Sequence, residues 1–166
     1  MPRSFALTAE SSSTVEEFHS AFRDEKYWRA RVAAMGNATL DSLVIESDGT
    51  VEVATTFRLL RDGLPTVFAR LRRGDLVMVH NETWGRIDGG GMSGDVSVRT
   101  TGVSLSAVGS GSMTPEREGS QLKYTATVDV KVPLIGGPLE SFIGSQLSQW
   151  LLEVQNFTTA WIAENA

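Results

Sequence analysis

The sequence predicts an α+β fold in which a long C-terminal helix packs across the apolar face of a curved antiparallel sheet of seven strands. The first observation is the tail after Pro138, which contains no glycine beyond Gly144, no proline, and apolar residues at steps of three and four. These are Leu139, Phe142, Ile143, Leu147, Trp150, Leu151, Val154, Phe157 and Trp161. The second observation is the alternation of apolar and polar residues over most of residues 38–132. A helix of roughly 40 Å with such a face needs a large concave partner, which the strands can supply.

Two short helices are predicted between the first strand and the rest of the sheet. Residues 4–10 alternate and predict a strand with one buried face. Ser13 and Glu16 have the spacing of a capping box, so a helix is expected to begin there. Its apolar face carries Val15, Phe18, His19 and Phe22. Asp24 can cap a second helix that stops at Gly36. That helix carries Tyr27, Trp28, Val32 and Met35.

Six further strands follow, separated by residues that favour turns. Turns are predicted at residues 48–49, 89–91 and 116–119, and a short helical segment between Pro65 and Gly74. The first three of these strands are expected before the turn at residue 48, at 51–59 and at 75–86. The other three run from the turn at 89–91 through Val98, from Val103 to about Met113, and from the turn at 116–119 to residue 132. The last strand alternates most regularly, with one face made of Leu122, Tyr124, Ala126, Val128, Val130 and Val132.

The composition is typical of one globular domain over residues 1–166, with 41% apolar and 21% charged residues. No apolar run approaches the roughly 18 residues of a membrane span. Residues 1–4 lack the features of a secretory signal, so a cytoplasmic location is expected. The absence of cysteine excludes disulfides, thiol catalysis and zinc sites built from cysteine. With two histidines in different elements, we expect no metal and no cofactor, and the net charge of −5 disfavours nucleic-acid binding.

One basic segment stands out from this composition. Five arginines lie between residues 58 and 73, against the single acid Asp62. They are Arg58, Arg61, Arg70, Arg72 and Arg73. The segment can be a solvated edge, or it can bind an anionic head group or an acidic partner.

Small residues on the sixth strand suggest a cavity. Ala107, Gly109 and Gly111 follow one another on the face that begins with Val103 and Leu105. They leave room above the sheet, either for a ligand or for close packing of the C-terminal helix.

The fourth strand carries the candidate polar groups of such a cavity. One face has Leu76, Met78, His80, Glu82 and Trp84, and the other has Val77, Val79, Asn81 and Thr83. Both faces begin with apolar residues, so periodicity does not decide which one points inward. If the first does, His80 and Glu82 can hold a hydroxyl or carboxylate, or act as a general acid–base pair. Otherwise they face solvent or satisfy one another. Arg99 on the next strand is a third candidate.

Two other features have simpler interpretations. His19 on the first helix fits a histidine at the edge of the core better than a ligand. Residues 89–94 match the pattern G-x-G-x-x-G, but they lead into a strand, so a hairpin is predicted in place of a dinucleotide site.

The order of elements, with its closing amphipathic helix, resembles the START-like (Bet v 1-like, SRPBCC) helix-grip superfamily over essentially the whole chain. More narrowly, the chain looks like an uncharacterised actinobacterial group of START-like proteins. The segments that carry this likeness are residues 81–84 (NETW), 102–106 (GVSLS) and 131–140 (KVPLIGGPLE). A lysine is expected after the second glycine in this group, and Pro138 stands there instead. The resemblance implies a cavity between sheet and helix for an apolar ligand such as a lipid; some superfamily members are cyclases or hydrolases.

We therefore expect the chain to bind a hydrophobic small molecule, lipid-like or aromatic, between the sheet and the C-terminal helix. The expected lining is Trp28, Phe57, Phe68, Met78, His80, Trp84, Arg99, Phe142 and Trp150, with Arg99 as a polar anchor. A cyclase- or hydrolase-type enzyme is the alternative, and it requires His80, Glu82 or Arg99 to converge. A third hypothesis is a module that binds a protein partner through the basic segment at residues 58–73. Binding without catalysis is favoured, and no catalytic residue is assigned.

Overall fold

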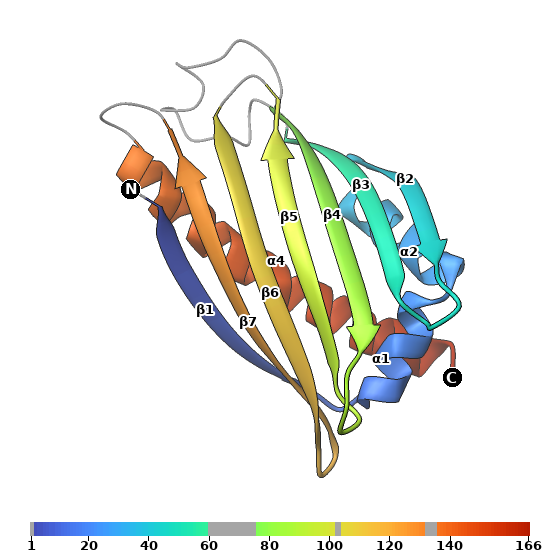
Figure 1. Cartoon of the computed structure of the whole chain (residues 1–166). Coiled ribbons are helices and arrows are strands. Elements are labelled where there is room, and N and C mark those ends of the chain that lie inside the picture. The colour runs from blue at the N-terminus through green and yellow to red at the C-terminus, as the bar shows by residue number, and fades with distance from the viewer. Residues whose placement is uncertain (1, 60–75, 102–103, 132–135) are drawn as a thin grey trace.

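The computed structural model describes residues 2–59, 76–101, 104–131 and 136–166, and it confirms the predicted α+β helix-grip architecture. Figure 1 shows a curved sheet with the long helix α4 crossing one of its faces. The elements are β1 (Arg3–Ser11), α1 (Val15–Phe22), α2 (Glu25–Met35), β2 (Ala38–Ile45), β3 (Val51–Leu59), β4 (Leu76–Arg86), β5 (Met92–Thr100), β6 (Leu105–Glu116), β7 (Gly119–Val130) and α4 (Gly136–Glu164).

The sheet has seven strands in the order β1-β7-β6-β5-β4-β3-β2, and neighbouring strands pair antiparallel. The strands β1 and β2 form opposite edges because α1 and α2 carry the chain from one edge to the other (Figure 1). Helix α4 packs mainly on β1 and β7, and its C-terminal part meets α1 and α2. The helices therefore cover one face of the sheet, which we call the inner face.

Both short helices begin at capping residues, one of them shifted from its predicted position. Thr14 caps α1: its hydroxyl accepts from the Glu17 amide at 3.2 Å, and the Glu17 carboxylate accepts from the Thr14 amide at 3.4 Å. The predicted pair of Ser13 and Glu16 was therefore wrong by one residue. Ser13 is buried, and its carbonyl accepts from the Ser120 hydroxyl at 2.8 Å. Asp24 caps α2 as predicted, and Gly36 ends that helix with a φ of 87°.

The buried side of α4 differs from the predicted apolar stripe at one position. Phe142 is 38% exposed, whereas Glu140 is fully buried and Gly144 faces the sheet. A methyl group added at Gly144 would overlap the ring of Phe5 on β1. The glycine thus allows helix and strand to approach closely, and this contact turns Phe142 toward solvent.

The small residues on β6 do not leave open space. Tyr124 on β7 lies over Gly109, so that an added methyl group would overlap its hydroxyl. Trp84 on β4 lies over Gly94 on β5 in the same way, and its ring also reaches Gly111. The space above these glycines was predicted to hold either a ligand or the closely packed C-terminal helix. Instead, the flat aromatic side chains of neighbouring strands fill it.

Candidate functional site

The inner face of β4 carries the polar residues of the candidate site. The buried residues of β4 include Leu76, His80, Glu82 and Trp84, which share the inner face. The residues that alternate with them on the outer face include Val79, Asn81 and Thr83, which are exposed. Register places His80 opposite Thr55 on β3 and Val98 on β5, both of which also belong to the inner face. Periodicity did not decide which face of β4 points inward. In the structure, it is the face that carries His80 and Glu82.

Glu82 lies at the centre of a polar cluster. Its Oε2 atom lies 3.1 Å from an Arg31 guanidinium nitrogen and 3.5 Å from Nδ1 of His80, while its Oε1 atom accepts from the Trp84 indole at 3.2 Å. All of these side chains are buried. A buried carboxylate is stable only when it is paired and hydrogen-bonded, and Glu82 meets both conditions.

Arg31 reaches the cluster from α2 and is held between two indole rings. Its guanidinium carbon lies 4.8 Å from the centre of the Trp28 ring and 5.5 Å from that of Trp150. Such positions over aromatic faces stabilise a cation. Tyr27 lies one turn before Arg31 on α2, and its hydroxyl oxygen lies 2.6 Å from Oγ1 of Thr158 on α4. The cluster therefore connects β4, α2 and α4.

Arg31 was not among the predicted site residues. The sequence does carry a signal for it, because Arg31 stands three residues after Trp28 and four after Tyr27. That spacing puts the cation on the apolar side of α2 with both aromatic residues. A single cation on a buried helical face needs an acidic partner, and Glu82 is the buried acid that faces it.

The cluster fixes the ionisation states of its members. Burial would raise the pKa of Glu82, but the charge of Arg31, the nearby His80 and the hydrogen bonds outweigh it, so this pKa is lowered. Burial would likewise lower the pKa of Arg31, but Glu82 and Tyr27 raise it overall. Burial, aided by the charge of Glu82, raises the pKa of Tyr124. At neutral pH, the cluster therefore contains an ionised Glu82 and Arg31 beside a neutral Tyr124.

His80 is the member of the cluster with unused hydrogen-bonding capacity. It is 2% exposed, and its Nε2 atom has no hydrogen-bond partner among the described residues. Burial lowers the pKa of His80, although the Glu82 carboxylate opposes this shift, so the imidazole is neutral at pH 7. Its ring meets Phe57 at 5.7 Å and Trp150 at 5.0 Å between centroids, both edge to face. A buried polar atom without a partner is uncommon and requires an explanation.

The apolar side chains around His80 keep partial exposure. Phe57, Met78 and Val98 lie on the inner face near the end of the sheet where α4 begins, and all three are half-buried. Ile143, Leu147 and Trp150 on the first half of α4 are half-buried as well. At the other end of the sheet, Val51, Met92 and Met113 are completely enclosed. Part of the solvent-accessible apolar surface of the inner face therefore lies beside His80, and Leu7, Leu40 and Leu43 on the edge strands are half-buried as well.

The structure brings most of the predicted site residues together. Phe57 and Trp150 contact His80, Met78 lies two residues away on the same face of β4, and Trp28 and Trp84 contact the charged neighbours of His80. Arg99 is exposed and alternates with the inward Val98, so it lies on the outer face and does not fit the expected polar anchor. Phe142 is exposed on α4, and Phe68 lies outside the described residues. The arginine-rich segment also lies outside them, apart from the exposed Arg58.

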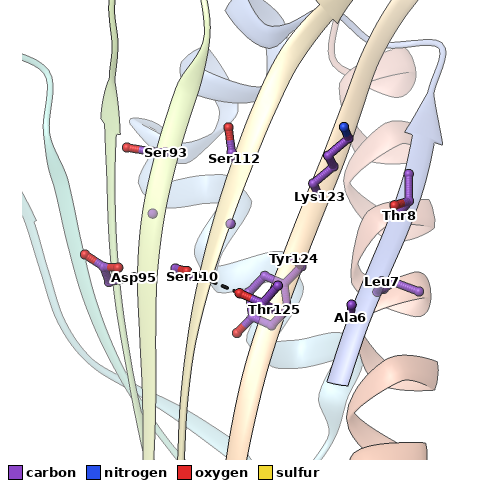
Figure 2. Close-up of a pocket in the computed structure, with 12 residues that line it drawn as sticks. Ala6, Leu7, Thr8, Ser93, Asp95, Ser110, Ser112, Lys123, Tyr124 and Thr125 are labelled. Atoms are coloured by element: carbon purple, nitrogen blue, oxygen red, sulfur yellow. Dashed lines mark hydrogen bonds between the residues drawn. The ribbon is translucent and has the colours of Figure 1, made fainter. Parts of the chain in front are cut away.

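A hollow lies on the outer face of the sheet. Figure 2 looks at that face, with the helices behind the strands. The hollow has a volume of about 520 Å³ and spans β1, β7, β6 and β5. Its lining includes Thr8, Ser93, Asp95, Ser110, Ser112, Lys123 and Thr125. Ser110 and Thr125 hydrogen-bond one another at 3.4 Å, and most of these side chains are exposed, so this surface resembles the solvated face of a sheet.

Other kinds of site find little support. Within residues 2–59, 76–101, 104–131 and 136–166, no three histidine or acidic side chains come close enough to hold a metal ion. His19 is buried, and its Nε2 lies 2.8 Å from the Gly49 carbonyl, so it fastens α1 to the β2–β3 hairpin. In the same described part of the chain, no helix combines the length and apolar character needed to cross a membrane.

Comparison with known proteins identifies the family. The family model described as "Protein of unknown function (DUF2505)" matches residues 6–162. The chain belongs to this family. An uncharacterized protein of Mycobacterium tuberculosis, Rv0481c, is 39% identical over 173 residues, and the match covers 99% of each chain. The narrower resemblance to an uncharacterised actinobacterial group is thus confirmed.

Two solved structures show that the DUF2505 chain has the START-like fold. A START superfamily protein from Mycobacterium smegmatis matches with a TM-score of 0.54 and 12% identity, covering 98% of this chain and 99% of the other. The di-domain ARO/CYC StfQ of the steffimycin biosynthetic pathway matches with a TM-score of 0.62 and 14% identity. The match covers 99% of this chain and 52% of StfQ. At such identities, the similarity concerns the fold alone.

Proposed function

We propose that this DUF2505 protein binds a hydrophobic small molecule, lipid-like or aromatic, on the inner face of the sheet beside helix α4. The observation that carries the proposal is the half-buried apolar surface around a buried imidazole nitrogen that has no hydrogen-bond partner in the described part of the chain. Interiors are normally close-packed, and their polar atoms are normally hydrogen-bonded. Here Phe57, Met78 and Trp150 keep partial exposure, and Nε2 of His80 lacks a partner among the described residues. A mostly apolar site with a few polar groups is typical of small-molecule pockets.

The START-like fold supports this proposal at the level of the superfamily, whose members are ligand-binding domains. Glu82 and Arg31 form one side of this site and hold no ligand charge, because they neutralise one another as an ion pair. The apolar walls then provide the affinity, and His80 provides a polar contact.

The first experiment is native mass spectrometry of freshly purified protein, in which we expect an apolar compound to co-purify.

The second experiment is fluorescence titration with N-phenyl-1-naphthylamine, an uncharged apolar probe. Replacing Trp150 by leucine should weaken the probe about tenfold, because an aromatic wall of the site is lost. Phe142→Ala is the matched control: it removes an exposed aromatic residue of the same helix and should leave the affinity unchanged. Absence of both a co-purified compound and saturable probe binding would refute the proposal.

An enzyme of the cyclase or hydrolase type is the second candidate function. The specific observation is the 3.5 Å approach of Glu82 to Nδ1 of His80, because a carboxylate in that position orients an imidazole as a general base. StfQ, which shares the fold, is an ARO/CYC protein of a biosynthetic pathway. Comparing the compound that co-purifies with wild type with the one that co-purifies with His80→Phe distinguishes the two candidates. An enzyme carries its product in wild type and the unconverted substrate, of different mass or isomeric form, in His80→Phe, whereas a binding protein carries the same compound in both.

A further inference from the structure

The two ring nitrogens of His80 differ in their surroundings, and this difference bears on the chemistry of the ligand. Nδ1 lies 3.5 Å from Oε2 of Glu82. A carboxylate only accepts hydrogen bonds, so this arrangement favours the tautomer with the proton on Nδ1. The other nitrogen, Nε2, then carries a lone pair and can only accept. Glu82 thus determines which kind of polar group the site can receive.

Leaving Nε2 of His80 without a hydrogen-bond partner also costs free energy. His80 is 2% exposed, and no donor among the described residues reaches this nitrogen. A buried acceptor without a partner has lost its hydrogen bonds to water and gained none in return, which destabilises the free protein. A ligand that supplies a donor recovers this free energy on binding, whereas an otherwise similar ligand without a donor does not.

The charged groups near His80 indicate that the donor is uncharged. The Arg31 guanidinium faces the cluster from α2 but is engaged by Glu82 and by the rings of Trp28 and Trp150. An anionic ligand would therefore meet the Glu82 carboxylate without gaining this cation. The rings of Phe57 and Trp150 beside His80 are apolar, so a cation at this point would lose its hydration.

We propose that the ligand is a neutral, apolar molecule with a hydroxyl group, phenolic or alcoholic, that donates a hydrogen bond to Nε2 of His80. The inference rests on the proposed function, since it names the chemical class of the molecule held at the same site. In this arrangement, Glu82 and Arg31 are positioning residues that act through His80.

The test compares two probes of nearly equal shape, 2-naphthol and 2-methoxynaphthalene, by isothermal titration calorimetry at pH 7. The first has the hydroxyl group, and the second carries a methyl ether in its place. Wild-type protein should bind 2-naphthol about tenfold more tightly, as one hydrogen bond to a buried acceptor predicts. In His80→Phe, the ratio should fall to about one, because phenylalanine keeps an aromatic ring but has no acceptor. His19→Phe makes the same substitution at the other buried histidine, and it should keep the ratio of wild type.

A measurement on wild-type protein makes the test independent of whether the variants fold. The chain has two histidines, so their ring nitrogens can be assigned by ¹⁵N-correlated NMR. We expect Nε2 of His80 to give the resonance of an unprotonated ring nitrogen in the free protein. That resonance should shift when 2-naphthol is added and stay in place with 2-methoxynaphthalene.

The outcomes separate the two proposals. Saturable binding of both probes with equal affinity, or a protonated Nε2 in the free protein, would overturn the hydroxyl assignment and leave the hydrophobic site standing. No saturable binding of either probe, together with no binding of N-phenyl-1-naphthylamine, would overturn the proposed function and this inference with it.

Discussion

Glu82 and Arg31 form an ion pair that joins the sheet to helix α2, with 3.1 Å between the carboxylate and the guanidinium and side chains that are each only 6% exposed. Removing two charges from water costs several kcal/mol per ion, and the attraction between them offsets this cost only when the geometry is good. The indole of Trp84 and the rings around the guanidinium complete that geometry. The pair is therefore more important for fixing α2 above the inner face than for net stability.

Replacing Arg31 by methionine should lower the free energy of unfolding by about 3–5 kcal/mol, because Glu82 is left buried without its cation. Urea denaturation followed by circular dichroism measures this change. The double variant Arg31→Met with Glu82→Gln should recover much of the loss, since no unpaired charge remains.

Arg29 provides a matched control on the same helix. It pairs with Glu25 one turn earlier, but its side chain is 69% exposed. Exposed pairs of this kind contribute about 0.3–0.5 kcal/mol, so Arg29→Met should change stability by no more than that. Equal losses from Arg29→Met and Arg31→Met would contradict the role assigned to the buried pair.

The parts of the fold that the sequence predicts well are those whose signals are local. In β7, one residue in two is buried, as its alternation indicates, because an antiparallel strand with one covered face needs only that pattern. The start of α2 at Asp24 and its end at Gly36 follow from capping, which involves neighbours in the chain. The length of α4 follows from the absence of glycine and proline in its second half.

The candidate site could be predicted only in part, because its decisive contacts are non-local. The inner face of β4 is defined by the pairing of Glu82 with Arg31 on α2, and alternation within the strand does not contain that information. The space above Gly109 is filled by Tyr124 from the neighbouring strand, which depends on side-chain direction across the sheet. Phe142 belongs to an apolar pattern, but the close contact of Gly144 with Phe5 rotates it outward.

The contact between Gly144 and Phe5 predicts that alanine at position 144 destabilises the protein, whereas helix propensity alone predicts that it stabilises it. Alanine stabilises a helix interior by roughly 0.5–1 kcal/mol relative to glycine. We nevertheless expect Gly144→Ala to destabilise the protein by about 1–3 kcal/mol, because its methyl group would overlap the Phe5 ring. In a Phe5→Ala background, the same substitution should become neutral or stabilising, which urea denaturation of the four proteins can measure.

Gly137 in the first turn of α4 is the control for this experiment. Its added methyl group would meet the Arg3 guanidinium at 3.4 Å, an ordinary contact. Gly137→Ala should therefore change stability by less than about 0.5 kcal/mol. A stabilised Gly144→Ala protein would show that α4 does not approach β1 as closely as described.

The outer position of Arg99 predicts that this residue does not contribute to ligand affinity. Arg99→Gln should leave the dissociation constant of N-phenyl-1-naphthylamine unchanged within about twofold, because the side chain is exposed on the face opposite α4. Met78→Ala, on the inner face, should weaken the probe severalfold by removing part of the apolar wall. A marked loss of affinity in Arg99→Gln would reinstate this arginine as a polar anchor.

The buried His80 predicts how stability depends on pH. Burial lowers the pKa of His80 in the folded protein, whereas in the unfolded chain this group titrates near its usual value of about 6.5. As the pH falls below that value, the unfolded state binds a proton that the folded state does not, so the free energy of unfolding decreases. One such group contributes at most about 1.4 kcal/mol per pH unit. Glu82, whose pKa is lowered in the folded state, adds its own loss only below about pH 4.5, where it begins to bind a proton in the unfolded chain.

Urea denaturation of wild type and His80→Phe between pH 7 and pH 5 isolates this contribution. We expect wild type to lose stability more steeply than the variant over this range, because the variant lacks the group that titrates there. The two proteins should show similar slopes between pH 8 and pH 7, where His80 is neutral in both the folded and the unfolded state. Parallel curves down to pH 5 would mean that His80 accepts a proton equally well in both states, which is incompatible with an imidazole enclosed by Phe57, Trp150 and the Glu82–Arg31 pair.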